Sequence, residues 1–210
     1  TYTGGTEVNA GANLVINSSA ALGSGGLALI GTATVPATLT VTATTTIANP
    51  ITVTGDPIFN IAPGTTTTVS TPITDGVSAG DVVVAGGGTL ELSAANTYTG
   101  LTSISNGSTL TLTGSGSITP SASLTNNGTF NISSKTGNIA LGGSYTQSTT
   151  GTLVMSFAPT SAQRITIAGS ANLAGTLNLV ASSGMYSVGK YTLLTANGIA
   201  GAFGTLNSNL

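Results

Sequence analysis

Large apolar side chains alternate with small or polar ones in short runs along the chain, and no run has the spacing of an amphipathic helix. The clearest runs are TLEL at Thr89–Leu92, TLTL at Thr109–Leu112, TFNI at Thr129–Ile132, RITI at Arg164–Ile167 and TLNL at Thr176–Leu179. A period of two is typical of a strand with one buried face, and Thr, Val and Ile favour strands. Gly, Asn and Ser between the runs predict turns. The pattern therefore predicts an all-β chain.

The runs recur at a nearly regular interval, which indicates a repeat protein. Their first large apolar residues are Leu90, Leu110, Phe130, Leu153 and Leu177. The series extends upstream less regularly, through Leu14, Leu39 and Phe59. A period of roughly 20–25 residues without helices predicts a β-solenoid, here a parallel β-helix, because the frame of a leucine-rich repeat is missing. At roughly 21 residues per coil, we expect about ten coils of three short strands.

Composition does not divide the chain, so residues 1–210 are expected to form a single β-helix domain with one core. Residues 61–73, IAPGTTTTVSTPI, are rich in Thr and interrupted by Pro, and they predict a loop or an irregular coil. Asn, Thr and Ser at equivalent positions of successive coils are expected to stack into hydrogen-bonded ladders. The opening phrase TYTGG returns as TYTGL at Thr97, which predicts equivalent positions for Tyr2 and Tyr98.

Charge is nearly absent, and this excludes several classes of function. Only 4% of residues are charged, the formal net charge is −2 and the mean hydropathy is +0.40, so a folded chain with a neutral hydroxyl and amide surface is expected. Three scattered basic residues, Lys135, Arg164 and Lys190, form no cluster that would bind nucleic acid. The absence of Cys excludes disulfides and thiolate metal sites. No run of apolar residues is long enough for a transmembrane helix, and the first residues do not read as a signal peptide.

The segment Gly88–Leu112, GTLELSAANTYTGLTSISNGSTLTL, resembles the autotransporter-associated β-strand repeat. Residues 140–210 resemble the C-terminal passenger segment of an autotransporter, with GSYTQSTTGTLVM, RITIAGSANLAGTLNL and GKYTLLTANGIAGAF as the matching stretches. The resemblance implies a right-handed parallel β-helix that is secreted or displayed on the bacterial outer cell surface. Passengers of this family serve as adhesins, aggregation factors, enzyme stalks or matrix components. Members often carry Asp shortly before the strand that reads RITI, where this chain has Gln163 and Arg164.

The inventory of chemically active residues is small, and no catalytic residue and no cofactor is predicted. The five acids are Glu7, Asp56, Asp75, Asp81 and Glu91. Asp75 and Asp81 flank GVSAG and are weak candidates for a shared Ca²⁺ site, which would need six to eight oxygen ligands; loop acids at turns are the simpler interpretation. Serine chemistry lacks a His base. A polysaccharide-active enzyme would require Asp75, Asp81 and Arg164 to meet in a groove.

The tyrosines are the remaining candidates for binding. Tyr2, Tyr98 and Tyr145 would suit a platform that stacks on sugars, but the shared repeat position of Tyr2 and Tyr98 favours packing at a corner with the hydroxyl bonded. We therefore expect a non-enzymatic stalk or scaffold whose partners are copies of itself, joined through open β-helix ends or sideways. A module that binds glycans or host surfaces is the alternative.

Overall fold

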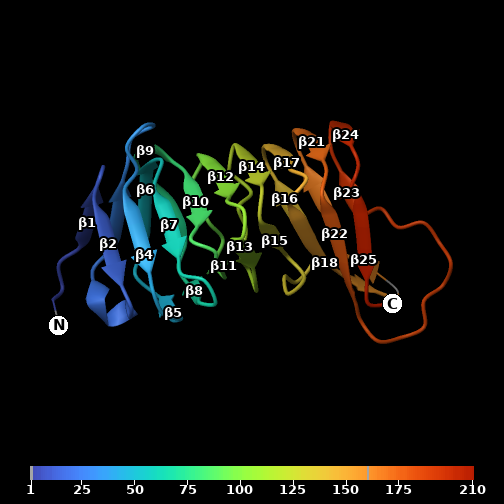
Figure 1. Cartoon of the computed structure of the whole chain (residues 1–210), viewed down its shortest axis with the longest axis horizontal. Helices are drawn as coiled ribbons and strands as arrows, with labels where there is room; N and C mark the ends of the chain where they lie inside the picture. The colour runs from blue at the N-terminus through green and yellow to red at the C-terminus, as the bar shows by residue number, and fades with distance from the viewer. Residues whose placement is uncertain (1, 160) are drawn as a thin grey trace.

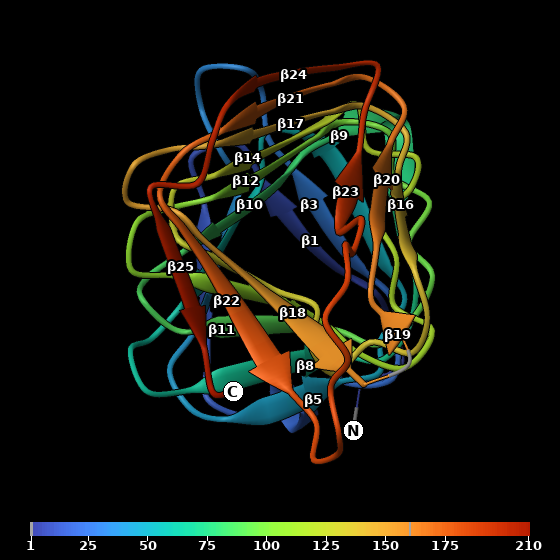
Figure 2. The ribbon, with the colours of Figure 1, turned by 90° about the vertical axis from the view of Figure 1, so that its right-hand side faces the viewer.

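The alternating runs form stacked parallel strands, and the chain winds as a β-solenoid with a small cross-section and a long axis (Figure 1). The computed structural model describes residues 2–159 and 161–210. Each coil contributes strands to separate sheets, and three sides enclose the core when the rod is viewed from its C-terminal end (Figure 2). The expected all-β solenoid is therefore confirmed.

Sheet A and sheet D form one side of the rod. Sheet A contains β1 (Thr6–Asn9), β3 (Leu27–Ile30), β6 (Ile51–Gly55) and β9 (Ile73–Gly80). Sheet D contains β16 (Ile139–Leu141), β20 (Ile165–Ile167) and β23 (Leu194–Thr195). Between them the same side continues through isolated contacts, such as the parallel bridge from Ala95 to Ser117 and the hydrogen bond from the Gly142 amide to the Thr119 carbonyl.

Sheet B runs the whole length of the rod. Its strands are β2 (Asn13–Ile16), β4 (Thr38–Val41), β7 (Ile58–Ile61), β10 (Val82–Ala85), β12 (Leu101–Ile104), β14 (Ser123–Asn126), β17 (Ser144–Gln147), β21 (Ser170–Leu173) and β24 (Gly198–Gly201). Nine stacked strands are separated by eight turns of the chain, against an expectation of about ten. The shortfall arises because coils at both ends of the rod are longer than those in the middle: Val84 pairs with Ile104, whereas Leu14 pairs with Leu39 and Ala171 with the still more distant Ile199.

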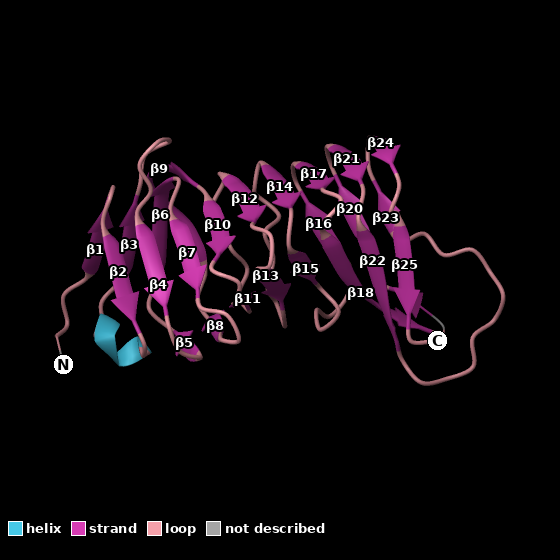
Figure 3. Ribbon diagram, viewed as in Figure 1, coloured by secondary structure: helices cyan, strands magenta, loops and turns pink. Residues whose placement is uncertain are grey.

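Sheet C forms the third side. Its stacked strands are β5 (Thr45–Ile47), β8 (Thr66–Val69), β11 (Thr89–Leu92), β13 (Thr109–Leu112), β15 (Thr129–Asn131), β18 (Thr152–Ala158), β22 (Thr176–Ala181) and β25 (Thr205–Ser208), and β19 (Ser161–Ala162) pairs antiparallel with β18. The 3₁₀ helix η1 (Ser19–Leu22) lies near the N-terminal end (Figure 3). No helix of the described residues is long and apolar enough to cross a bilayer.

The register confirms the principal repeat column. The five residues used for the spacing, from Leu90 to Leu177, are successive partners in sheet C, and Leu206 extends the column. The upstream residues Leu14, Leu39 and Phe59 also pair in succession, but in sheet B. Leu90 pairs with Thr67 instead of continuing from Phe59. The single series predicted from spacing is therefore two columns, because a period measured along the chain does not identify which side of the coil a strand occupies.

Residues 61–73 contain the regular strand β8 and its connections, where a loop or an irregular coil was expected. A turn at Pro63 and Gly64 leads into β8, where the side chains of Thr67 and Val69 point into the core and are fully buried. Thr is a good strand residue, and one inward Thr is tolerated because its apolar methyl group packs in the core. The Pro residues lie in the connections that flank the strand, where no ladder hydrogen bond is lost.

The predicted polar ladders are present on the outer surface. The Thr40 hydroxyl donates to Asn13 Oδ1 at 2.8 Å, and Asn60 Nδ2 donates to the Thr40 hydroxyl at 3.2 Å. Asn207 Nδ2 donates to Asn178 Oδ1 at 2.9 Å near the other end. Inside, a continuous cluster of buried Val, Ile, Leu and Phe side chains extends from Val8 to Leu177. Each coil is thus joined to its neighbours by backbone ladders, by side-chain ladders and by a shared core.

Candidate functional site

Tyr98 lies inside the solenoid and presents no ring face to solvent. Its hydroxyl is 2.7 Å from the Thr102 hydroxyl, which is 2.8 Å from the hydroxyl of Ser121 in the next coil. Burial raises the pKa of Tyr98 well above its usual range, the hydrogen bond with Thr102 opposes the rise, and the charge of Asp81 adds to it. The Tyr98 hydroxyl therefore stays neutral and is connected to the next coil through Thr102.

Tyr2 repeats this local arrangement in a different place. Its hydroxyl bonds the Thr6 hydroxyl four residues on, as Tyr98 does with Thr102. Thr6 begins β1 in sheet A, however, whereas Thr102 lies in β12 of sheet B. Tyr2 is 47% exposed and Tyr98 is fully buried. The repeated phrase thus keeps its local hydrogen bond while the strand that follows it occupies another side of the coil.

Tyr145 is also fully buried, on the core side of β17. Its hydroxyl donates to Gln147 Oε1 at 2.5 Å, and Gln147 Nε2 donates to the carbonyls of Gly151 and Ala174 at 3.0 and 2.8 Å. Desolvation raises the pKa of Tyr145 above its usual range although a hydrogen bond from Asn126 opposes it. The burial of Tyr98 and Tyr145 leaves Tyr2 as the exposed member of the three proposed platform residues.

The side chains of Asn96 and Gln163 are buried amides whose bonding the sequence reasoning did not predict. Asn96 accepts from the Ile73 amide at 2.9 Å and donates to the Ser117 carbonyl at 2.9 Å, so that it joins three coils. Gln163, which stands at the departure from the family pattern, accepts from the Ser156 amide and donates to the Ile132 carbonyl. No local sequence signal marks these two amides, because their partners are backbone groups of other coils that would otherwise be left unpaired.

Asp75 and Asp81 each accept hydrogen bonds from the segment 99–101 of the neighbouring coil. Asp75 accepts from the amide and hydroxyl of Thr99, at 3.0 and 2.7 Å, and from the Gly80 amide at 3.0 Å. Asp81 accepts from the Leu101 amide at 2.8 Å. In the part of the chain that the structure describes, no group of three His, Cys, Asp or Glu residues is placed to hold a metal ion. Asp75, which lies within β9, and Asp81, which directly follows it, thus hold the segment 99–101 in place.

The pKa values of these two acids move in opposite directions. Partial burial alone would raise the pKa of Asp75, but the hydrogen bonds from Thr99 and Gly80 outweigh it and lower the pKa below its ordinary value. The pKa of Asp81 is raised, first by burial and also by the charge of Asp56, against the bond from the Leu101 amide. Asp75 therefore favours folding most when it is ionised, and Asp81 favours folding most when it is protonated.

We expect the opposite pKa shifts of Asp75 and Asp81 to have opposite effects on how the melting temperature depends on pH. The stabilisation from Asp75 is present above its unfolded pKa and is lost as the pH falls through its lower folded value, whereas the contribution of Asp81 is present in acid and is lost as the pH rises. Asp75→Asn should therefore lower the melting temperature at neutral pH and flatten its fall in acid. Asp81→Asn should raise the melting temperature at neutral pH and leave it unchanged in acid. Thermal melts followed by circular dichroism would check both, and identical pH profiles for the two variants would contradict the assignment.

Arg164 lies far from the two acids. It precedes β20 in sheet D and is exposed, whereas Asp75 lies in β9 of sheet A. The segment at 95–98, the segment at 117–119 and β16 intervene on the same side of the rod. Steps of about 4.8 Å between these successive segments separate β9 from β20 by roughly 19 Å along the axis. The convergence that a polysaccharide-active enzyme would require is not found for these three residues.

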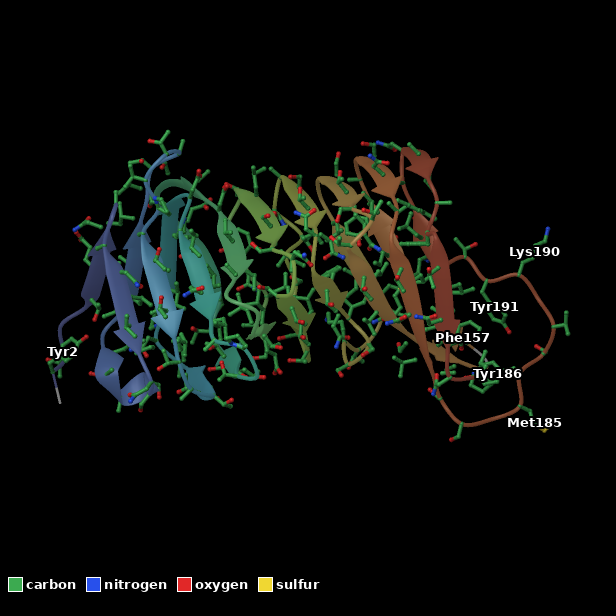
Figure 4. The ribbon with its side chains drawn as sticks, viewed as in Figure 1. Tyr2, Phe157, Met185, Tyr186, Lys190 and Tyr191 are labelled. Carbon is green, nitrogen blue, oxygen red and sulfur yellow. The ribbon has the colours of Figure 1, made fainter. Side chains whose placement is uncertain are left out.

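Two surface features remain near the C-terminal end. A shallow groove of about 480 Å³ over sheet C is lined by the amides of Asn178, Asn207 and Asn209 and by apolar residues that include Val154 and Val180. The loop 182–193 between β22 and β23 is held by an aromatic cluster of Phe157, Tyr186 and Tyr191 (Figure 4). The ring centroids of Phe157 and Tyr186 are 5.3 Å apart in a stacked pair, and those of Phe157 and Tyr191 are 4.8 Å apart in an edge-to-face pair. These are the surfaces from which a binding function has to be argued.

Comparison with known proteins adds no further constraint. No family model, no curated protein and no solved structure matches this chain. The function is therefore argued from the geometry of the solenoid and its surfaces.

Proposed function

We propose that this chain is a non-enzymatic structural β-helix, secreted or displayed on the bacterial outer cell surface, that acts as a stalk or scaffold and associates with itself. In this proposal the solenoid winds to the right and corresponds to the C-terminal stalk part of an autotransporter passenger, as the sequence resemblance implies. The observation that carries the proposal is the continuous parallel stack, in which sheet B joins all the turns of the described chain from β2 at one end of the rod to β24 at the other.

The long sheets and the nearly uncharged surface support the two parts of the proposal, a stiff stalk and self-association. Long sheets joined by ladder hydrogen bonds resist bending, and stability is shared between neighbouring coils. With 4% charged residues, electrostatic repulsion between copies is weak. Contacts along the sides or through the ends of the rod would give a filament, a matrix or an aggregate of cells.

Sedimentation velocity of the purified 210-residue chain tests this proposal. We expect species larger than the monomer whose amount grows with protein concentration. Because few charges are involved, their amount should change little between about 0.1 and 1 M salt, whereas an ionic association would weaken as the Debye length shrinks. A strictly monomeric species at all concentrations would contradict self-association, and strong dissociation by salt would contradict its neutral mechanism.

A module that binds glycans is the second candidate, and the groove over sheet C is the observation that favours it. Asn178 and Asn207 place stacked amides beside the apolar side chain of Val180, which is 45% exposed. Amides hydrogen-bond sugar hydroxyls, and an apolar neighbour packs against sugar carbon atoms. A glycan array with wild type and Asn178→Ala would test this; binding that is lost in the variant would support the groove, and binding by neither protein would remove the candidate.

A further inference from the structure

Strand β9 contains a bulge that the preceding coil does not pair with. In the register with β6, Val53 pairs with Asp75 and Gly55 pairs with Gly80. One residue of β6 therefore stands opposite the four residues 76–79, which we call the bulge. A usual bulge sets two residues against one, so this bulge is larger than usual and is displaced from the strand ladder on this side.

The next coil holds the two ends of the bulge. The Thr99 amide donates to Asp75 Oδ1 at 3.0 Å, and the Leu101 amide donates to Asp81 Oδ1 at 2.8 Å. The Gly80 amide also donates to Asp75 Oδ1, at 3.0 Å, and closes the neck of the bulge. The two acids therefore fix the chain on either side of the bulge and leave the bulge itself to solvent.

The bulge is exposed and consists of small residues. All four of its residues are exposed, and Val77 is 93% exposed. Its sequence, GVSA, contains no charged residue, no Pro and no aromatic residue. Exposed segments of small and polar residues are preferred sites of proteolytic nicking. A serine endopeptidase with a small specificity pocket, the elastase type, fits an aliphatic side chain of the size of Val77.

The exposed turn at residues 32–35 offers a contrast, because its own hydrogen bonds hold it closed. The Thr32 amide donates to the Val35 carbonyl at 2.9 Å, and the Val35 amide donates to the Thr32 hydroxyl at 3.1 Å. In the part of the chain that the structure describes, no side-chain hydrogen bond holds the bulge in this way. Proteolysis of a folded protein proceeds through local opening, and the bulge is therefore the easier segment to open.

We propose that the bond between Val77 and Ser78 is a cleavage site for a serine endopeptidase of the elastase type. The serine hydroxyl of the endopeptidase attacks the Val77 carbonyl carbon, the C–N bond breaks, and the amine of Ser78 leaves with a proton from the histidine of the endopeptidase. Water then hydrolyses the acyl-enzyme and leaves a carboxylate on Val77. Cleavage at this bond does not depend on self-association of the rod.

The cut leaves the rod intact, because other contacts join the two fragments. Strand β10 pairs with β7 in sheet B, and β11 pairs with β8 in sheet C. Buried side chains of both fragments belong to one core cluster, and stability in a solenoid is shared between neighbouring coils. Residues 1–77 and 78–210 therefore stay together as a nicked rod whose new ends are a carboxylate and an amine.

Limited proteolysis of the full 210-residue chain tests the site. The chain is treated with a small amount of elastase under native conditions, and the products are analysed by intact mass spectrometry and size-exclusion chromatography. We expect fragments 1–77 and 78–210, which elute together until a denaturant is added. Cuts confined to the loop 182–193, or a chain that stays uncut, would overturn the proposal. Fragments that separate without denaturant would contradict the intact nicked rod.

A change of specificity at the same position provides a second test. Val77→Lys removes the aliphatic side chain and supplies one that fits the acidic pocket of trypsin. We expect the cut after residue 77 by elastase to be lost and a cut by trypsin to appear there. Val15→Lys is the matched control, because Val15 is also exposed, at 58%, but lies within β2 and pairs with β4. Equal trypsin cleavage of the two variants at the new lysines would show that exposure alone decides and would overturn the role of the bulge.

Asp75→Asn tests the neck of the bulge. A neutral amide accepts weaker hydrogen bonds than a carboxylate, so that the bulge opens more easily and elastase cleavage after Val77 should accelerate at least about fivefold. Trypsin cleavage after Lys135 in the same variant reports any general loss of stability, because Lys135 lies in another coil, where its amide donates to the Ile132 carbonyl at 2.9 Å. Equal acceleration at both sites would contradict a local role of Asp75 in closing the bulge.

Discussion

Replacing Tyr98 by Ala is expected to lower the free energy of unfolding by about 3–5 kcal/mol, the cost of removing a large buried aromatic side chain. The Tyr98 ring is fully buried, and its hydroxyl bonds the Thr102 hydroxyl, which in turn bonds Ser121 in the next coil. The substitution leaves a cavity in a narrow core and removes one hydrogen-bond partner of Thr102. Urea unfolding followed by circular dichroism measures the effect.

Two controls separate the ring from the hydroxyl and the buried site from the exposed one. Tyr98→Phe keeps the ring and should cost about 1–3 kcal/mol, because the Thr102 hydroxyl loses one of its partners in the core. Tyr2→Ala removes the matching residue of the repeated phrase at a position that is 47% exposed, and should cost less than about 1 kcal/mol. Equal losses for Tyr2→Ala and Tyr98→Ala would contradict the difference between the two sites.

Gly100→Ala is the second substitution with a large expected effect. A Cβ atom at Gly100 would meet the Gly80 carbonyl oxygen and an oxygen of Asp81, both well inside van der Waals contact. Relief requires the coils at Gly80 and Gly100 to move apart, and the stacked ladders hold them together. We expect a loss of about 3 kcal/mol, at the upper end of what overpacking usually costs.

Gly4 supplies the matched control, because it occupies the same place in the repeated phrase. A Cβ atom at Gly4 has no heavy atom within 4 Å. Gly4→Ala should therefore leave the free energy of unfolding within about 0.5 kcal/mol of wild type. If chemical denaturation finds Gly100→Ala as stable as Gly4→Ala, the inference that the coils at Gly80 and Gly100 are in close contact is wrong.

Much of the fold follows from sequence because a solenoid is built from contacts between neighbouring coils. The alternation of residues predicts the strands, and the recurrence of Leu90, Leu110 and Phe130 predicts their stacking, which the register confirms. The sequence pattern does not predict which side of the coil each strand occupies. Tyr2 and Tyr98 lie in nearly the same phrase yet precede strands of different sheets, since the side that a strand takes depends on the lengths of all the preceding turns.

The buried polar residues show where sequence reasoning about sites reaches its limit. Tyr98 and Tyr145 are aromatic residues in a polar chain, so that a role in packing and a role in binding give the same pattern along the sequence. Three-dimensional burial separates the two roles, and it depends on neighbouring coils. Asn96 and Gln163 were missed for the same reason, because their partners are backbone groups at Ser117 and Ile132 that only the fold brings near.

Small-angle X-ray scattering over a range of protein concentrations tests the central claim, a structural rod that associates with itself. Eight steps of about 4.8 Å give a stack about 40 Å long. The account predicts that the particles grow as concentration rises, in the largest dimension for contacts through the ends of the rod or in the radius of the cross-section for lateral contacts. Dimensions that stay those of a single rod at every concentration would contradict it.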